Sequence, residues 1–148
     1  MTSPLCTVFV YGTLMPSERN AHVARAGGPF TATRAILQGY QLLHLYPEGY
    51  PAIIPSLGQQ VSGYALTYDP AVWPAALPFL DRLEGLDEVP PLYSREEVTL
   101  TTDLGEILPA WVYVYARTER LNQAGASPVP SGDWRDIQGR GQRGPDER

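Results

Sequence analysis

Short apolar runs separated by glycine and proline fill much of the chain and predict a protein built mainly of strands. Residues 8–11 form a β-branched and aromatic run that ends at Gly12, which is typical of a buried strand that turns into a loop. Residues 31–46 predict one or two strands, broken at a central glycine, and residues 61–68 predict another strand. Between them, the prolines of residues 47–51 predict a turn-rich loop.

A hairpin and two helices complete the predicted elements. Residues 92–102 and 110–116 predict two strands joined by a polar turn, and the second alternates aromatic residues with valine, which gives it two usable faces. A short helix capped near Asn20 is expected after the first strand. Residues 77–84 predict the regular part of a broken helix, because prolines disturb the apolar stripe that begins before it.

Length and composition indicate one globular domain. The chain has 148 residues, of which 43% are hydrophobic and 18% are charged, a mixture that favours a single buried core over disorder. We expect the domain to cover residues 1–136, with Trp134 anchoring its last segment on the core. Residues 137–148 are expected to be a disordered tail, because glycine, proline and charged residues dominate there.

Charge and hydropathy narrow the range of partners. The formal net charge is −5, and all 11 basic residues are arginine, which excludes lysine Schiff-base chemistry and a lysine-dependent phosphate loop. An acidic chain without a basic cluster is a poor binder of nucleic acid. The sequence has neither a long apolar run nor a signal-peptide pattern, so we expect no membrane partner and a cytoplasmic location.

Cysteine and histidine are too few for the usual metal sites. Cys6 is the single cysteine, and His22 and His44 are the two histidines, so the usual zinc patterns cannot be assembled and no metal is expected. Cys6 lies within the first apolar run, where a buried and inert thiol is a better interpretation than a nucleophile. For His22, a pocket role and a structural role beside a turn both stay open.

The junction at residues 11–14 carries the first candidate chemistry. Gly12 lacks a Cβ, so the backbone can turn there and another molecule can approach closely. Backbone N–H groups exposed in such a turn can converge on an anionic or carbonyl oxygen. An ordinary junction between a strand and a turn has the same local pattern, and the pattern alone leaves both interpretations open.

A series of short motifs follows in order along the chain. The series consists of Tyr11-Gly12-Thr13-Leu14, Gly49-Tyr50-Pro51-Ala52, Val61-Ser62-Gly63-Tyr64, Leu80-Asp81-Arg82-Leu83-Glu84-Gly85, Tyr93-Ser94-Arg95 and Gly132-Asp133-Trp134. This series resembles the γ-glutamylcyclotransferase-like superfamily, also called AIG2-like, over roughly residues 5–135. Residues 15–18 depart from the glycine-containing continuation that is common after the first motif, which leaves substrate specificity open.

The resemblance implies an α+β fold, a small and mostly antiparallel β-barrel of about six strands with a few short helices. It implies an enzyme that cyclises a γ-glutamyl amide or γ-glutamyl-amine to 5-oxoproline and releases the amine, with no cofactor. The partner is then a small γ-glutamyl molecule, while the leaving amine and the oligomeric state stay open. The alternative is a non-catalytic protein that binds a small molecule on the same scaffold, since many AIG2-like proteins have no assigned reaction.

Glu84 is the predicted catalytic residue. On a helical wheel it shares the apolar stripe of Leu77 and Leu80, which places a carboxylate at the end of that face. The resemblance puts Glu84 at the position of the family's general acid/base, whereas neighbouring Asp81 does not match it and is predicted to be dispensable. The alternative is a structural carboxylate that pairs with an arginine such as Arg95.

The remaining predicted site residues contact the substrate. The resemblance implies that the first motif holds the product-like ring through backbone amides. The predicted binding residues of this motif are Tyr11, Gly12, Thr13 and Leu14. Tyr93 and Tyr115 are weaker candidates for closing the pocket, because aromatic residues in hairpin strands are more often part of the core. Arg95 is predicted to orient either Glu84 or the substrate carboxylate.

Overall fold

A computed structural model describes most of the chain. The described residues are 5–12, 14–16, 18, 21–26, 28–46, 50–83 and 91–136. Three residues with predicted roles lie outside this part, namely Thr13, Asn20 and Glu84. The predicted tail at 137–148 also lies outside it, so the division of the chain at residue 136 stays a prediction.

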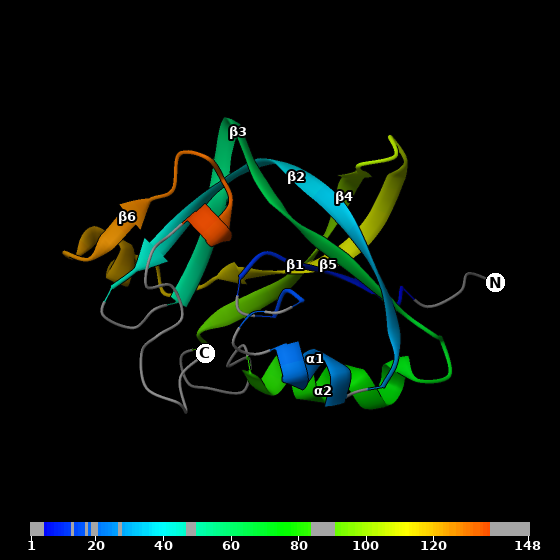
Figure 1. Ribbon diagram of the computed structural model, residues 1–148. Helices are drawn as coiled ribbons and strands as arrows, with labels where there is room; N and C mark the ends of the chain where they lie inside the picture. The colour runs from blue at the N-terminus through cyan, green and yellow to red at the C-terminus, as the bar shows by residue number, and fades with distance from the viewer. Residues whose placement is uncertain are drawn as a thin grey trace.

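Five strands close into a barrel, and a sixth strand extends the sheet outside it (Figure 1). The strands are β1 (Thr7–Val10), β2 (Phe30–Leu45), β3 (Tyr50–Tyr68), β4 (Tyr93–Thr102), β5 (Ile107–Tyr115) and β6 (Ala126–Pro128). Their order is β3-β1-β5-β4-β2-β6, and an additional pairing of β3 with β2 closes the ring. Only β1 and β5 pair in parallel among these strands. The predicted small, mostly antiparallel barrel is therefore confirmed.

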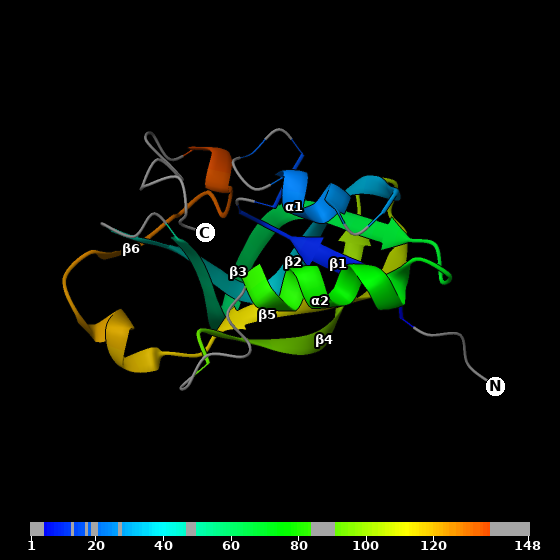
Figure 2. The same cartoon turned by 90° about the horizontal axis from the view of Figure 1, so that it is seen from below.

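In the described part of the chain, two α-helices lie side by side against the barrel, and two 3₁₀ turns follow β5 and β6 (Figures 1 and 2). These elements are α1 (Ala21–Ala26), α2 (Trp73–Leu83), η1 (Thr118–Asn122) and η2 (Trp134–Asp136). Within the described residues, no helix is long and apolar enough to cross a bilayer.

The largest difference from the sequence prediction is the length of β3. Its first half, which we predicted as a loop up to Pro51 with no strand before Val61, pairs with β2 from Tyr50 onward. This strand was not predicted because prolines usually interrupt the hydrogen bonding between strands. Pro51 nevertheless lies opposite His44, and Pro55 lies opposite Tyr40 at the edge of an irregularity.

That irregularity lies where a break in the first long strand was predicted. The pairing of β2 with β3 shifts register between Gln38 and Tyr40, yet β2 continues on both sides. Gly39 and Gly58 on the two strands have φ values of 86° and 85°, which a side chain with a Cβ rarely adopts. The glycine thus marks a bulge within one strand rather than the end of a strand.

Helix α2 is continuous, which corrects the prediction of a broken helix. It runs from Trp73 to Leu83 although it contains Pro74 and Pro78. Pro74 lies in the first turn, where its missing N–H would have no partner within the helix. Pro78 removes one internal hydrogen bond, and the burial of Trp73 and Leu80 against the core stabilises the helix in spite of this loss.

The barrel interior is closely packed. Phe9 of β1, Leu66 of β3 and Val112 of β5 have no exposed surface. Gly63 of β3 allows the close approach of β1, because a Cβ there would lie 2.3 Å from the Val10 carbonyl oxygen. Cys6 is buried, as predicted, and this burial raises the pKa of its thiol.

Candidate active site

The loop after β1 is held against the start of β3. The Met15 N–H donates to the Gly12 carbonyl at 3.1 Å, which closes a turn directly after the strand. A Cβ on Gly12 would lie 2.4 Å from Cγ of Pro51. Because carbon atoms pack at about 3.5–4.0 Å, only glycine fits here. Packing against the Pro51 ring therefore requires glycine at this position, whereas the predicted approach of a ligand to Gly12 stays a prediction.

Four predicted site residues in the described part of the chain are deeply buried, namely Tyr11, Leu14, Tyr93 and Tyr115. Tyr11 is 5% exposed and donates its hydroxyl to the Tyr113 carbonyl at 2.5 Å. Tyr93 is 1% exposed and donates to the Pro51 carbonyl. Its ring packs edge-on against Tyr115, with 5.4 Å between centroids. These side chains are part of the core and also fix the positions of the Gly12 loop and β3.

Asp81, which we predicted to be dispensable, joins helix α2 to the hairpin of β4 and β5. Its Oδ2 accepts a hydrogen bond from Nη1 of Arg95, and its Oδ1 accepts one from the Tyr113 hydroxyl at 2.7 Å. The Arg95 guanidinium also lies over the Trp111 ring, 5.2 Å from its centroid. The hydrogen bond to Asp81 is the main reason that the pKa of Arg95 is raised. The described partner of Arg95 is thus Asp81. Its predicted roles toward Glu84, which lies outside the described residues, and toward a substrate carboxylate stay predictions.

The two parts of the site are connected through Tyr113. Its carbonyl accepts from Tyr11 at the start of the loop, and its hydroxyl donates to Asp81 in the last turn of α2. Glu84 follows α2 directly in the sequence, so the segment before it is fixed relative to the loop. Its own side chain lies outside the described residues. The sequence analysis assigned no site role to Asp81 or Tyr113. The one available signal was that Asp81 and its partner Arg95 each lie in one of the motifs, whereas Tyr113 lies in none.

The histidines lie away from these contacts. His22 is exposed on α1, which supports neither a buried structural role nor a described pocket role. His44 packs beside Trp134, with 5.3 Å between ring centroids. Within the described residues, no group of three or more histidine, cysteine or acidic side chains could hold a metal ion.

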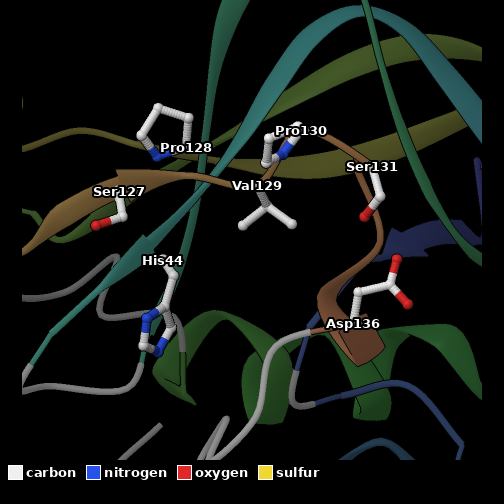
Figure 3. A pocket seen from close by; sticks show the side chains of 7 residues that line it. All are labelled: His44, Ser127, Pro128, Val129, Pro130, Ser131 and Asp136. Atoms are coloured by element: carbon white, nitrogen blue, oxygen red, sulfur yellow. The ribbon is translucent and has the colours of Figure 1, made fainter.

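A separate hollow of about 350 Å³ lies between β2, β6 and η2 (Figure 3). Figure 3 shows His44 and Asp136 on opposite sides of it. The lining residues are His44, Ser127, Pro128, Val129, Pro130, Ser131 and Asp136. None of the predicted site residues is among them, so this hollow is distinct from the contacts around Gly12 and Asp81.

A closed mixed barrel of five strands, with a glycine loop after β1 and an acidic motif at the end of α2, defines the class of this protein. Residues 8–136 match the family "Gamma-glutamyl cyclotransferase, AIG2-like". The chain is 32% identical over 127 residues to a Vibrio cholerae protein named "Putative gamma-glutamylcyclotransferase", covering 86% of this chain and 93% of that protein. The chain therefore belongs to the AIG2-like γ-glutamylcyclotransferase family, as its motifs predicted.

Solved structures share the fold. An Arabidopsis thaliana protein determined in solution has a TM-score of 0.64 at 24% identity, over 90% of this chain and 73% of that chain. A mouse AIG2-like protein has a TM-score of 0.60 at 22% identity, over 90% of this chain and 93% of that chain. At these identities the likeness concerns the fold alone.

Proposed function

We propose that this protein cyclises a γ-glutamyl amide or γ-glutamyl-amine conjugate to 5-oxoproline and releases the free amine. Its membership of a γ-glutamylcyclotransferase family supports this reaction class. The observation that carries the proposal is the double hydrogen bonding of Tyr113, whose carbonyl binds Tyr11 and whose hydroxyl binds Asp81. It couples the loop proposed to bind the substrate to the turn that precedes Glu84.

The reaction requires folding of the substrate and two proton transfers. The α-amino nitrogen attacks the γ-carbonyl carbon, a new C–N bond closes the five-membered ring, and the C–N bond to the leaving amine breaks. A base must first take a proton from the α-ammonium group, and the second proton that the attacking nitrogen loses as the ring closes must then pass through an acid to the departing nitrogen. The substrate supplies its own nucleophile, so neither water nor a nucleophilic side chain is consumed.

Glu84 is the proposed base and acid. A glutamate in an apolar pocket has its pKa raised towards neutrality, which suits both transfers. Asp81, the described carboxylate of the motif, is less suited, because both of its oxygens already accept hydrogen bonds from Arg95 and Tyr113. Backbone amides of the Gly12 loop are proposed to bind the γ-carbonyl oxygen, where negative charge develops in the transition state.

A substrate panel tests the reaction class. Purified protein is incubated with γ-glutamyl amino acids, γ-glutamyl-ε-lysine, glutathione and γ-glutamylamines, and 5-oxoproline is measured by mass spectrometry. We expect at least one member to yield 5-oxoproline together with an equal amount of amine. Tight binding of 5-oxoproline with no turnover of any member would instead favour the non-catalytic binding protein.

Substitution of Glu84 tests the mechanism. Glu84→Gln keeps the shape of the side chain but cannot take the ammonium proton, so kcat should fall by about 10²–10⁴ while 5-oxoproline still binds. Glu97→Gln is the matched control, because Glu97 is exposed on β4. Near-normal turnover by a folded Glu84→Gln protein would refute the assignment.

Asp81→Asn distinguishes the role of Asp81 from the acid/base role proposed for Glu84. We now expect it to lower stability and raise KM, because an amide cannot accept from both Arg95 and Tyr113. The pH dependence of kcat should persist in Asp81→Asn and disappear in Glu84→Gln. A loss of this pH dependence in Asp81→Asn alone would transfer the acid/base role to Asp81.

A further inference from the structure

The segment from β6 to η2, residues 126–136, forms a strap across the outside of the barrel, here called the C-terminal strap (Figures 1 and 2). It begins as β6 on the edge of β2, where Ser127 lies opposite His44. It then crosses β3, where the Ser62 N–H donates to the Gly132 carbonyl at 2.8 Å. Trp134 is fully buried beside His44, which confirms the predicted anchor.

Gly132 shows how closely the strap follows β3. Its φ is 71°, and a Cβ there would lie 2.2 Å from the Gln60 carbonyl oxygen. Two side chains shape the turn that follows, since the hydroxyl of Ser131 accepts from the Asp133 N–H and the carboxylate of Asp133 accepts from the Arg135 N–H. The backbone at Arg135 is therefore fixed before its side chain makes any contact.

The Arg135 guanidinium uses all three of its nitrogens on the loop and the barrel. Nε donates to the Glu18 carboxylate at 3.1 Å, Nη2 donates to the Pro16 carbonyl, and Nη1 donates to the Tyr64 hydroxyl at 3.0 Å. The Glu18 side chain is only 9% exposed, so this ion pair is well shielded from solvent. A lysine could not make this planar set of contacts.

Tyr64 provides a fixed platform for this arginine. It lies on β3 opposite Val10, the last residue of β1, and therefore beside the start of the loop. The guanidinium groups of Arg34 and Arg135 lie 5.3 and 5.1 Å from the centroid of its ring. Hydrogen bonds from Arg34, the larger effect, and from Arg135 lower the pKa of the Tyr64 phenol. The position of Arg135 is thus set by Tyr64 of β3 as well as by the strap.

Three backbone hydrogen bonds link described residues between Gly12 and Ala21. Met15 N–H donates to the Gly12 carbonyl, Glu18 N–H donates to the Met15 carbonyl, and Ala21 N–H donates to the Glu18 carbonyl, at 3.0–3.1 Å. Pro51 packs against Gly12 in the first turn, and Arg135 contacts Pro16 and Glu18. Loops with few internal contacts sample several conformations unless both ends are fixed.

We propose that Arg135 is a positioning residue that fixes Pro16 and Glu18 and thereby presets the Gly12 loop for its ligand. The role in binding rests on the proposed function, whereas the ordering of the loop does not. A preset loop loses less conformational freedom when the ligand binds. Loss of the Arg135 side chain should therefore weaken binding of 5-oxoproline and raise KM more than it lowers kcat.

Hydrogen–deuterium exchange tests the ordering of the loop. In Arg135→Ala, the amides of Met15 and Glu18 should exchange about tenfold faster or more, while the amides of the β2–β3 hairpin keep their rates. Arg135→Lys should give an intermediate effect, because it keeps the charge near Glu18 and loses the forked contacts. Asp136→Asn is the control on the same strap, since Asp136 is exposed and lines the separate hollow.

Calorimetry with 5-oxoproline and steady-state kinetics test the consequence for the site. We expect Kd and KM to rise about five- to tenfold in Arg135→Ala, equivalent to about 1 kcal/mol, with kcat changed less than twofold. Unchanged loop exchange would overturn the proposal, and so would a rise in exchange that is equal across the barrel. If wild-type protein neither turns over a substrate nor binds 5-oxoproline, the proposed function fails, and the exchange data still decide whether Arg135 orders the loop.

Discussion

Replacement of Gly12 by alanine gives a quantitative test of how the loop packs on β3. The added Cβ would lie 2.4 Å from Cγ and 3.0 Å from Cβ of Pro51. Restoring an ordinary carbon separation of about 3.5 Å requires a movement of about 1 Å. The proline ring is rigid and buried, so the loop must move, at a cost of about 1–3 kcal/mol. For a chain of this size the melting temperature should fall by roughly 2–12 °C.

The same movement should displace the amides proposed to bind the γ-carbonyl oxygen, so calorimetry should show weaker binding of 5-oxoproline. Pro51→Ala removes the Cγ atom and keeps the carbonyl that accepts from Tyr93. The double variant should therefore recover part of the lost stability, with a coupling of at least about 0.5 kcal/mol. Gly58→Ala, where φ is 85° and nothing lies near a Cβ, is destabilised by backbone strain alone and should not couple to Pro51→Ala. Additive effects of Gly12→Ala and Pro51→Ala would refute the steric explanation.

Two further predictions concern stability. Burial raises the pKa of Tyr68 from 10 to about 12, so the folded state holds this proton more tightly and loses stability as the pH rises from 10 to 12. By pH 11 the loss is about 1.4 kcal/mol, and denaturant titrations at pH 9 and 11 should show that Tyr68→Phe lacks it. A chain ending after Ile137 should melt like wild type, whereas a chain ending before Ser131 loses buried Trp134 and the contacts of Arg135 and should melt at lower temperature; equal melting temperatures would contradict this reasoning.

The elements predicted correctly are those whose signals are local. The apolar run before Gly12 and the hairpin of β4 and β5 follow from period-two patterns and turn residues, and both form close to where they were expected. The first half of β3 was missed because Pro51 and Pro55 look like breakers in isolation. Whether a proline interrupts a sheet depends on whether its position needs an N–H donor, which is a property of the partner strand.

The contacts that shape the site are long-range, and this explains why the sequence alone could not supply them. Glu18 and Arg135 are separated by 117 positions, and Tyr11 and Tyr113 by 102. Periodicity and turn chemistry report on neighbours within a few residues. The ordered motifs predicted the family and the barrel correctly, yet they did not indicate that Asp81 binds Arg95, because a motif gives positions and not partners.

The Asp81 contacts change the interpretation of the acidic motif. A carboxylate whose two oxygens accept from Arg95 and Tyr113 cannot move to a substrate proton without leaving those donors unpaired. The same contacts fix the last turn of α2 relative to β5, where the Tyr113 carbonyl accepts a hydrogen bond from Tyr11. The motif therefore combines a carboxylate that orients the end of the helix with one, Glu84, that we propose for proton transfer. This division explains why two acidic side chains three residues apart in the sequence need not be interchangeable: Asp81 is held by Arg95 and Tyr113, so its replacement should change geometry rather than acid/base chemistry.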